Sequence, residues 1–299
     1  MLRNIPLEHA AAEGLDRLAI ERVRVEEPDA LSPARPVGLE HHPLGGARAG
    51  LVLAEIASRC MISSIRVEGR ARIRLLSETM PMSRWFDHYA ATFDTVEINN
   101  SFYRLPKAET FDKWRDQAPP GFCYAVKANR FITQAKKLMD CEEPLARMMP
   151  LLRRLGATLG PVLYQLPPRL KLNLERLGRF LELVPKDVTN VFEFRDPSWY
   201  EPDTYALLDR HGASFCVHDM AGSASERLVV GPVAYVRFHG GAGKYWGRYS
   251  DEALLSWTDW IVAQAKGGRP VWCYFNNDID AHAIGDAMTL KAMVAQAAG

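Results

Sequence analysis

Residues 191–217 read VFEFRDPSWYEPDTYALLDRHGASFCV, which is one complete strand–helix–strand unit. The runs 191–194 and 214–217 are short and apolar on both faces, as strands of a buried parallel sheet are. Between them, residues 202–210 carry apolar side chains at helical spacing, and Gly212 follows as a helix stop that tolerates the left-handed conformation. This unit predicts an α/β fold.

The same alternation extends in both directions from this unit. Further candidate strands lie at residues 65–67 (the weakest), 95–98, 122–126, 162–165, 234–238 and 271–275. Helical patterns lie at residues 82–92, 110–117, 142–155, 172–184, 251–265 and 281–297. Eight strands, each followed by a helix, predict a (β/α)8 TIM-like barrel, which typically spans roughly 250 residues. An open doubly wound sheet is the alternative, but it would normally carry a glycine-rich phosphate loop after its first strand, and no GxGxxG motif occurs.

The first 80 residues differ from the rest of the chain. They contain no Phe, Tyr, Trp or Lys, and all 29 aromatic residues lie beyond Met80. We therefore predict an atypical, Arg-rich and poorly ordered extension over residues 1–60, and a barrel domain over residues 61–299. Four origins of the extension stay open: a flexible segment, a gene-model artefact from translated GC-rich DNA, an accessory interaction segment, or a targeting peptide, against which its acidic residues argue.

Composition excludes several classes of protein. The 299 residues carry a formal net charge of +1, which disfavours a nucleic-acid-binding domain. No apolar run approaches the ~20 residues of a membrane helix, and no secretion pattern opens the chain, so we expect a cytoplasmic protein without a membrane partner. The five cysteines show no CxxC spacing, which disfavours a disulfide framework or a zinc–thiolate site.

Polar residues collect where the predicted strands end. In barrels of this kind the carboxyl ends of the strands meet at one face, where chemistry takes place. Charges on a buried sheet are costly unless they are paired or hydrogen-bonded, so a shared pocket or a structural ion-pair network would explain them. With strand-end amides and two nearby aromatic residues included, the candidate ligand-binding residues are Asn99, Tyr103, Lys127, Gln165, Arg195, Trp199, His218, Asp219, Arg237, Asn276 and Asn277.

Three residues are candidate catalytic groups. Glu97 and Glu193 are candidate acids or bases, because a carboxyl group beside Lys or Arg has a tunable pKa. His239 is a candidate general base near neutral pH. Ion pairs of the two carboxylates with Lys127 or the arginines, and a backbone hydrogen bond to His239, are the structural alternatives.

Several of these strand-end residues are also candidates for binding a metal ion or an anionic group. Glu97, Glu193, His218 and Asp219 offer oxygen and imidazole ligands to a divalent metal, but no HxH or HExxH spacing supports such a site. A bound anionic group facing the cationic side chains is better supported than a Schiff base at Lys127. No nucleotide-cofactor motif occurs.

Six stretches carry a family resemblance. In order they are FDTVEINNSFYRLP (93–106), VKANRFIT (126–133), LYQLPP (163–168), EFRDPSW (193–199), YVRFHG (235–240) and YFNND (274–278). From about Pro81 to the C-terminus the chain resembles the DUF72, or YecE-like, family of TIM-barrel proteins. The resemblance implies a TIM-like barrel and a shared strand-end pocket, but it implies no reaction.

The chain departs from the family pattern at its start. Family members usually have a Gly-x-x-Gly-Trp-like loop after the first strand, whereas residues 65–77 read IRVEGRARIRLLS. A reading-frame slip that ends near Ser77 would explain this difference and would leave the first strand altered.

These observations predict a protein that binds a polar or anionic small molecule. If it is an enzyme, acid/base chemistry of the hydrolase, lyase or isomerase type fits better than redox chemistry. The alternatives are a non-catalytic module for a nucleic-acid or protein partner, bound through Arg-rich loops, and a defective copy with an altered first strand. The sequence names no substrate, metal or oligomeric state.

Overall fold

The computed structural model describes residues 60–64, 81–220, 223–277, 279 and 282–298. The predicted extension therefore lies outside the described residues except for its last residue, and so does the candidate strand at residues 65–67.

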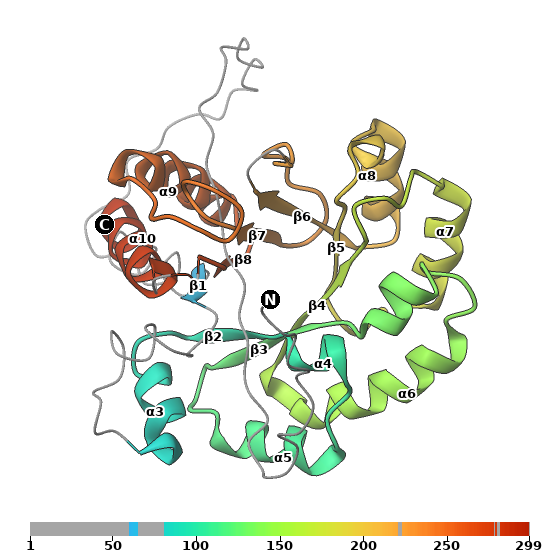
Figure 1. Cartoon of the computed structure of the whole chain (residues 1–299), viewed down its shortest axis with the longest axis horizontal. Coiled ribbons are helices and arrows are strands. Elements are labelled where there is room, and N and C mark those ends of the chain that lie inside the picture. Colours follow the sequence, from blue (N-terminus) through green and yellow to red (C-terminus); the bar gives the residue numbers. More distant parts are fainter. Residues whose placement is uncertain (1–59, 65–80, 221–222, 278, 280–281, 299) are drawn as a thin grey trace, which may run out of the picture.

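The described strands form one parallel sheet in the order β1-β8-β7-β6-β5-β4-β3-β2. Strands β2 to β8 curve into a nearly closed barrel of the α/β class, and the short β1 pairs with β8 at its edge (Figure 1). No backbone pairing joins β1 to β2 within the part of the chain that the structure describes. The strands are β1 (Cys60–Ser64), β2 (Thr95–Ile98), β3 (Cys123–Lys127), β4 (Leu159–Gln165), β5 (Asn190–Glu193), β6 (Ser214–Asp219), β7 (Ala234–Phe238) and β8 (Val271–Phe275).

Helices surround the barrel on its outer side (Figure 1). Local sequence sets where they start: the Ser250 side chain accepts a hydrogen bond from the Ala253 N–H at the start of α9, and Asn173 does the same for Arg176 at the start of α7. The α-helices are α3 (Trp85–Ala90), α4 (Asn100–Tyr103), α5 (Ala108–Gln117), α6 (Glu142–Leu152), α7 (Leu174–Leu183), α8 (Pro202–Arg210), α9 (Asp251–Lys266) and α10 (His282–Ala298). Shorter turns of helix are η1 (Met82–Arg84), the π-helix η2 (Phe131–Ala135), η3 (Arg153–Thr158) and η4 (Pro197–Trp199).

Most predicted elements are found where the pattern places them. The strands at 95–98, 234–238 and 271–275 and the helix at 202–210 agree to the residue. The first strand that the structure describes is residues 60–64, which pair with β8 in the register Cys60 opposite Val271, while the candidate strand at residues 65–67 lies outside the described residues. The single-turn helix α4 and the π-helix η2 were not predicted, because elements of four or five residues leave no periodic pattern.

An aromatic layer packs between the barrel and its helices. Tyr164 of β4 stacks on Phe192 of β5 with ring centroids 5.1 Å apart, and Phe238 of β7 meets Trp257 of α9 edge to face at 5.0 Å. Such pairs contribute about 0.5–1.5 kcal/mol each beyond the area they bury. This layer holds the strands in place, so that the polar side chains inside the barrel have fixed positions.

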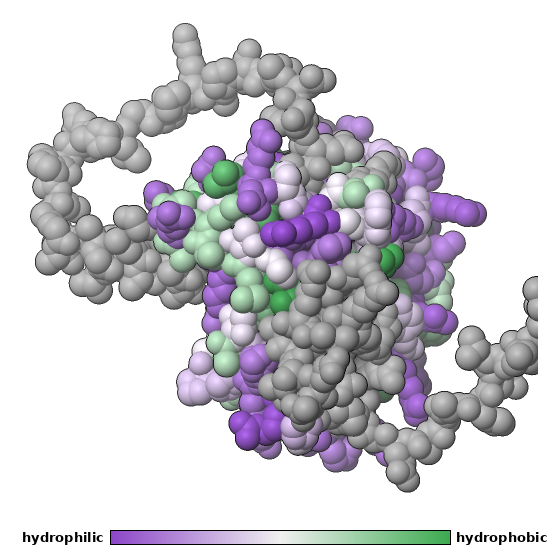
Figure 2. Space-filling model, turned by 60° about the vertical axis from the view of Figure 1, so that its left-hand side comes forward, coloured by the Kyte–Doolittle hydropathy of each residue, from purple (hydrophilic) through white to green (hydrophobic). Residues whose placement is uncertain are grey.

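On the face drawn in Figure 2, hydrophilic and hydrophobic residues are interspersed among the residues that are coloured. None of the described helices combines the length and the apolar character that crossing a membrane requires.

Candidate functional site

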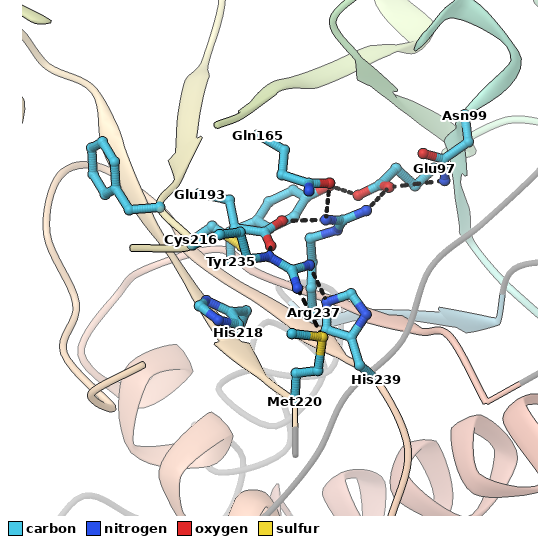
Figure 3. A network of polar contacts seen from close by, with 12 residues as sticks. Glu97, Asn99, Gln165, Glu193, Cys216, His218, Met220, Tyr235, Arg237 and His239 are labelled. Carbon is cyan, nitrogen blue, oxygen red and sulfur yellow. Dashed lines mark hydrogen bonds and ion pairs between the residues drawn. The ribbon is translucent and has the colours of Figure 1, made fainter. Parts of the chain in front are cut away.

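Alternate positions on β7 place Tyr235, Arg237 and His239 on the same side of the strand. Glu97 near the carboxyl end of β2 and Glu193 at the end of β5 meet them inside the barrel. Figure 3 shows these side chains pointing toward one another from separate strands. The predicted convergence of polar groups from different strand ends is therefore present for these residues.

Arg237 joins the two carboxyl groups. Its Nη2 donates to Oε1 of Glu97 at 2.9 Å, and its Nη1 donates to Oε2 of Glu193 and, at 3.3 Å, to Oε1 of Gln165. All atoms of the Arg237, Glu97 and Glu193 side chains are buried. Buried charges of this kind are tolerated only because each is paired.

Arg195, just beyond β5, extends the chain of contacts. Its Nε donates to Oε1 of Glu193, its Nη2 contacts Nε2 of His239 at 2.7 Å, and its Nη1 donates to the Met220 sulfur at 3.1 Å. We call the connected group the strand-end network; it comprises Glu97, Asn99, Gln165, Glu193, Arg195, Met220, Tyr235, Arg237 and His239.

Glu97 has the best-defined electrostatic environment in the network. Its carboxylate accepts hydrogen bonds from the Tyr235 hydroxyl and, at 3.2 Å, from the Asn99 amide. Burial raises the pKa of Glu97 from 4.5 to about 7, against the lowering effects of the Lys127 charge and of the Tyr235 hydrogen bond, while the Glu193 charge raises it further. A carboxyl group with this pKa is present in both protonation states at neutral pH.

His239 is held in one tautomer. A guanidinium has no acceptor, so the contact with Arg195 requires that Nε2 of His239 accepts and that its ring proton lies on Nδ1. Burial, together with the positive charge of Arg195, lowers the pKa of His239 well below 6.5, so the ring is neutral. In this arrangement His239 offers an N–H donor, and its acceptor nitrogen is occupied; the expected role as general base would require Arg195 to move.

Lys127 lies beside the network on β3. Its ammonium group is 4.4 Å from the Phe102 ring centroid, in a cation–π contact. Burial lowers the pKa of Lys127, while the charges of Glu97 and Glu193 raise it. Burial likewise raises the pKa of Glu193, against the lowering effects of Arg195 and Lys127.

The strand-end network and Lys127 together contain more cationic groups than carboxyl groups. Burial lowers the pKa of Arg237 to about 9, so its guanidinium is still protonated at neutral pH. The three cationic groups of Lys127, Arg195 and Arg237 face two carboxyl groups. When all five are ionised, these five groups carry one net positive charge, and the buried carboxyl group of Asp219 lies at the same end of the barrel.

Among the predicted ligand-binding residues that lie outside the network, the two aromatic ones contact aromatic neighbours. Tyr103 on α4 is 70% exposed and meets Phe102 edge to face. Trp199 is fully buried, stacks on Phe194 with centroids 4.7 Å apart, and donates from its indole nitrogen to the Leu170 carbonyl at 2.6 Å. These contacts give Trp199 a role in packing, and its role in ligand binding stays a prediction.

The residues that follow β8 also make contacts of their own. The Asn277 amide donates to Oδ2 of Asp286 at 2.6 Å and to the Gly247 carbonyl, which ties α10 to the loop after β7. Asn276 is buried, and its backbone N–H donates to the Phe238 carbonyl. Their predicted contact with a ligand stays a prediction.

The two residues that end β6 are buried at the same end of the barrel. The His218 ring lies with its centroid 6.4 Å from that of His239, and burial, with Arg195, lowers the pKa of His218 well below 6.5. Asp219 is also buried. Within the described residues no group of three His, Cys, Asp or Glu side chains is arranged to hold a metal ion.

Two members of the network were not predicted. Tyr235 lies two residues before Arg237 on β7, so the period of two along a strand was a signal that its side chain faces the same way. Met220 follows β6 and carries no charge, and no pattern in the sequence points to its sulfur as a partner of Arg195.

A surface hollow of about 350 Å³ lies at α3, lined by Arg84, Asp87, His88 and Ala91, and shares no residue with the strand-end network.

A family model and two known proteins match this sequence. The family model described as "Protein of unknown function DUF72" matches residues 70–299, which begins earlier than the resemblance noted from about Pro81. The UPF0759 protein YunF of Bacillus subtilis is 26% identical over 225 residues, which is 64% of this chain and 79% of that protein. The UPF0759 protein YecE of Escherichia coli K12 is 29% identical over 118 residues, 38% of this chain and 42% of that protein.

Solved structures agree with the fold. The crystal structure of a DUF72 family protein from Thermotoga maritima matches with a TM-score of 0.69 and 25% identity, covering 79% of this chain and 98% of that one. A second DUF72 family structure, from Enterococcus faecalis, matches with a TM-score of 0.68 at 17% identity, covering 79% and 95%. At that identity the second match shows the fold alone.

Proposed function

We infer a function from the premise that this chain belongs to the DUF72 family, a family of unknown function. We propose that it binds a polar small molecule with an anionic group at the carboxyl ends of the barrel strands. Glu97 then makes acid/base chemistry of the hydrolase, lyase or isomerase type available to that molecule.

One observation carries this proposal: the buried carboxyl group of Glu97, whose pKa is about 7, lies among Arg237, Tyr235 and the Lys127 charge. The interior of a TIM-like barrel is ordinarily filled by Val, Ile and Leu. A carboxyl group poised near neutral pH in that position is the arrangement that acid/base enzymes use, because catalysis is best when the pKa of the group lies near the working pH.

The charge of the cluster supports an anionic ligand. The cationic side chains of Lys127, Arg195 and Arg237 outnumber the carboxylates of Glu97 and Glu193 by one. A buried excess of charge is costly, and a bound anion would neutralise it. Proton transfer by a positioned carboxyl group typically contributes 10²–10⁴-fold to a rate, so Glu97 would account for only part of a catalysed reaction.

The proposal also covers the role of β1 in the barrel and the kind of partner that we expect. We take β1 as the strand that completes a (β/α)8 barrel, since it pairs in parallel with β8 at the open edge. We expect no nucleic acid as a partner.

A structural ion-pair network is the second candidate, and one observation favours it. Both carboxylate oxygens of Glu193 accept from a guanidinium, one from Arg195 and one from Arg237, which satisfies the buried charges without a ligand. Under this interpretation the polar groups have a structural role in the barrel and bind no ligand.

The two candidate functions, an anion-binding pocket and a structural ion-pair network, differ in whether an anion binds in a way that depends on Lys127. Mass spectrometry of the small molecules that co-purify with the full chain comes first, followed by NMR titration with acetate, succinate and inorganic phosphate. We expect at least one anion to bind saturably, and Lys127→Met to weaken that binding at least tenfold. Lys266→Met, at the exposed end of α9, is the matched control and should leave binding unchanged. Binding that is equally strong in both variants, or none with any anion, would support the structural network.

A further inference from the structure

The strand-end network opens toward solvent at only one of its charged groups. Glu97, Glu193 and Arg237 have no exposed surface, whereas Arg195 keeps 5% and the adjacent Met220 keeps 8%. Any molecule that reaches the network from solvent would therefore meet its more exposed members, the half-buried Gln165 with Met220, Asn99 and Arg195, before the two buried carboxyl groups. His239, the other partner of Arg195 at this end, is fully buried.

One edge of the Arg195 guanidinium is hydrogen-bonded to a charged group, and the other edge contacts neutral groups. Its Nε donates to the Glu193 carboxylate on the inner side. Its outer edge, formed by Nη1 and Nη2, faces the Met220 sulfur at 3.1 Å and Nε2 of His239 at 2.7 Å. Both of these acceptors are neutral, and a thioether sulfur is a weak acceptor.

This outer edge is the part of an arginine that carboxylates ordinarily occupy. Two parallel N–H groups in a planar fork match the two oxygens of a carboxylate, and the charge-assisted bonds are roughly twice as strong as neutral ones. In this protein the fork is held by a sulfur and an imidazole nitrogen, so exchange of the sulfur for a carboxylate oxygen would strengthen the hydrogen bond from Nη1.

We propose that the outer edge of Arg195 binds the carboxylate group of an organic acid, and that the Met220 thioether occupies the position of that carboxylate when no acid is bound. This inference rests on the proposed function, since it names the ligand class and the anchoring residue of the same site. A monoanion matches the single positive charge that remains when the carboxyl groups of Glu97 and Glu193 are ionised.

Met220 is suited to the role of a removable side chain. It directly follows β6, which ends at Asp219, and it is therefore the first residue beyond the rigid barrel. An unbranched side chain with three rotatable bonds can leave the guanidinium without movement of the strand. The incoming carboxylate would then accept from Nη1 in place of the sulfur.

Two substitutions test this assignment in the full chain at pH 8, with acetate as the probe and NMR titration as the measurement. Arg195→Lys keeps the charge but removes the planar fork, and we expect the acetate dissociation constant to rise at least tenfold. Met220→Leu keeps a similar side-chain volume but removes the competing sulfur, and we expect acetate to bind at least threefold more tightly. Because Met220→Leu adds no buried charge, it keeps the test valid if Arg195→Lys does not fold.

The outcomes distinguish a failure of this assignment from a failure of the proposed function. Acetate binding that Lys127→Met weakens, but that neither Arg195→Lys nor Met220→Leu changes, would overturn the Arg195 assignment and leave the strand-end pocket intact. Binding of phosphate in preference to acetate would overturn the carboxylate class. No Lys127-dependent binding of any anion would overturn both.

Discussion

Replacement of Glu193 by Gln should destabilise the protein strongly, because this residue holds two buried guanidinium groups at once. Its Oε1 accepts from Arg195 and its Oε2 from Arg237, and the side chain has no exposed surface. A glutamine keeps the shape, but it offers one neutral acceptor and turns an N–H donor toward a guanidinium. Neither arginine can lose its charge easily, so both stay buried with a weaker partner.

The expected size follows from measured buried pairs. Breaking a buried ion pair by removing one partner costs about 3–5 kcal/mol, and for a domain of this size 1 kcal/mol lowers Tm by about 2–4 °C. We therefore expect Glu193→Gln to lose about 3–5 kcal/mol of unfolding free energy, and its Tm to fall by about 6–20 °C.

The assay is urea denaturation followed by circular dichroism, with calorimetry for Tm. Glu175→Gln is the matched control, since Glu175 pairs with Arg179 one turn along α7 while its side chain is 73% exposed. That exposed pair should contribute no more than about 0.5 kcal/mol. If Glu193→Gln changed stability as little as Glu175→Gln does, the buried pairing described above would be refuted.

Three further predictions concern single residues. Since burial raises the pKa of Glu97 from 4.5 to about 7, the native state binds a proton that the unfolded chain has released between those pH values. The unfolding free energy of the wild type should therefore fall by about 3 kcal/mol relative to Glu97→Gln as pH rises from about 4.5 to about 7; denaturant titrations that give a constant difference would contradict this. The ¹⁵N NMR spectrum of His239 should show a neutral ring protonated on Nδ1 from about pH 5 to 8, and titration near 6.5 would contradict the contact with Arg195. Trp199→Phe should lower the unfolding free energy by about 1–3 kcal/mol, because the Leu170 carbonyl loses its buried hydrogen-bond donor. The same substitution should leave anion affinity unchanged in NMR titrations. A large loss of affinity would show that Trp199 contributes to ligand binding.

Much of the barrel could be predicted from the sequence because its strands are buried on both faces. Runs such as 234–238 and 271–275 are continuous and apolar enough to have clear ends. The first strand could not be placed in this way, since Cys60–Ser64 is short and weakly patterned. Its position depends on pairing with β8, more than 200 residues later in the chain.

The members of the site were easier to predict than their contacts. Four residues were correctly predicted to be neighbours in space from their positions at strand ends: Glu97, Glu193, Arg237 and His239. The partners of Arg237 lie 140 and 44 residues away in the sequence, so only the closed arrangement of strands decides which carboxylate it meets. For the same reason, no sequence pattern shows that Arg195 takes the acceptor nitrogen of His239.

The ionisation of Glu97 tests the account most directly. Selective ¹³C labelling of glutamate carboxyl groups, with Glu97→Gln to assign the signal, would follow this one group by NMR through a pH titration. We expect a midpoint near 7, because the group is buried inside the barrel among the other charges of the network. A midpoint at or below 4.5 would show an ordinary carboxylate and would contradict a strand-end site poised for acid/base chemistry.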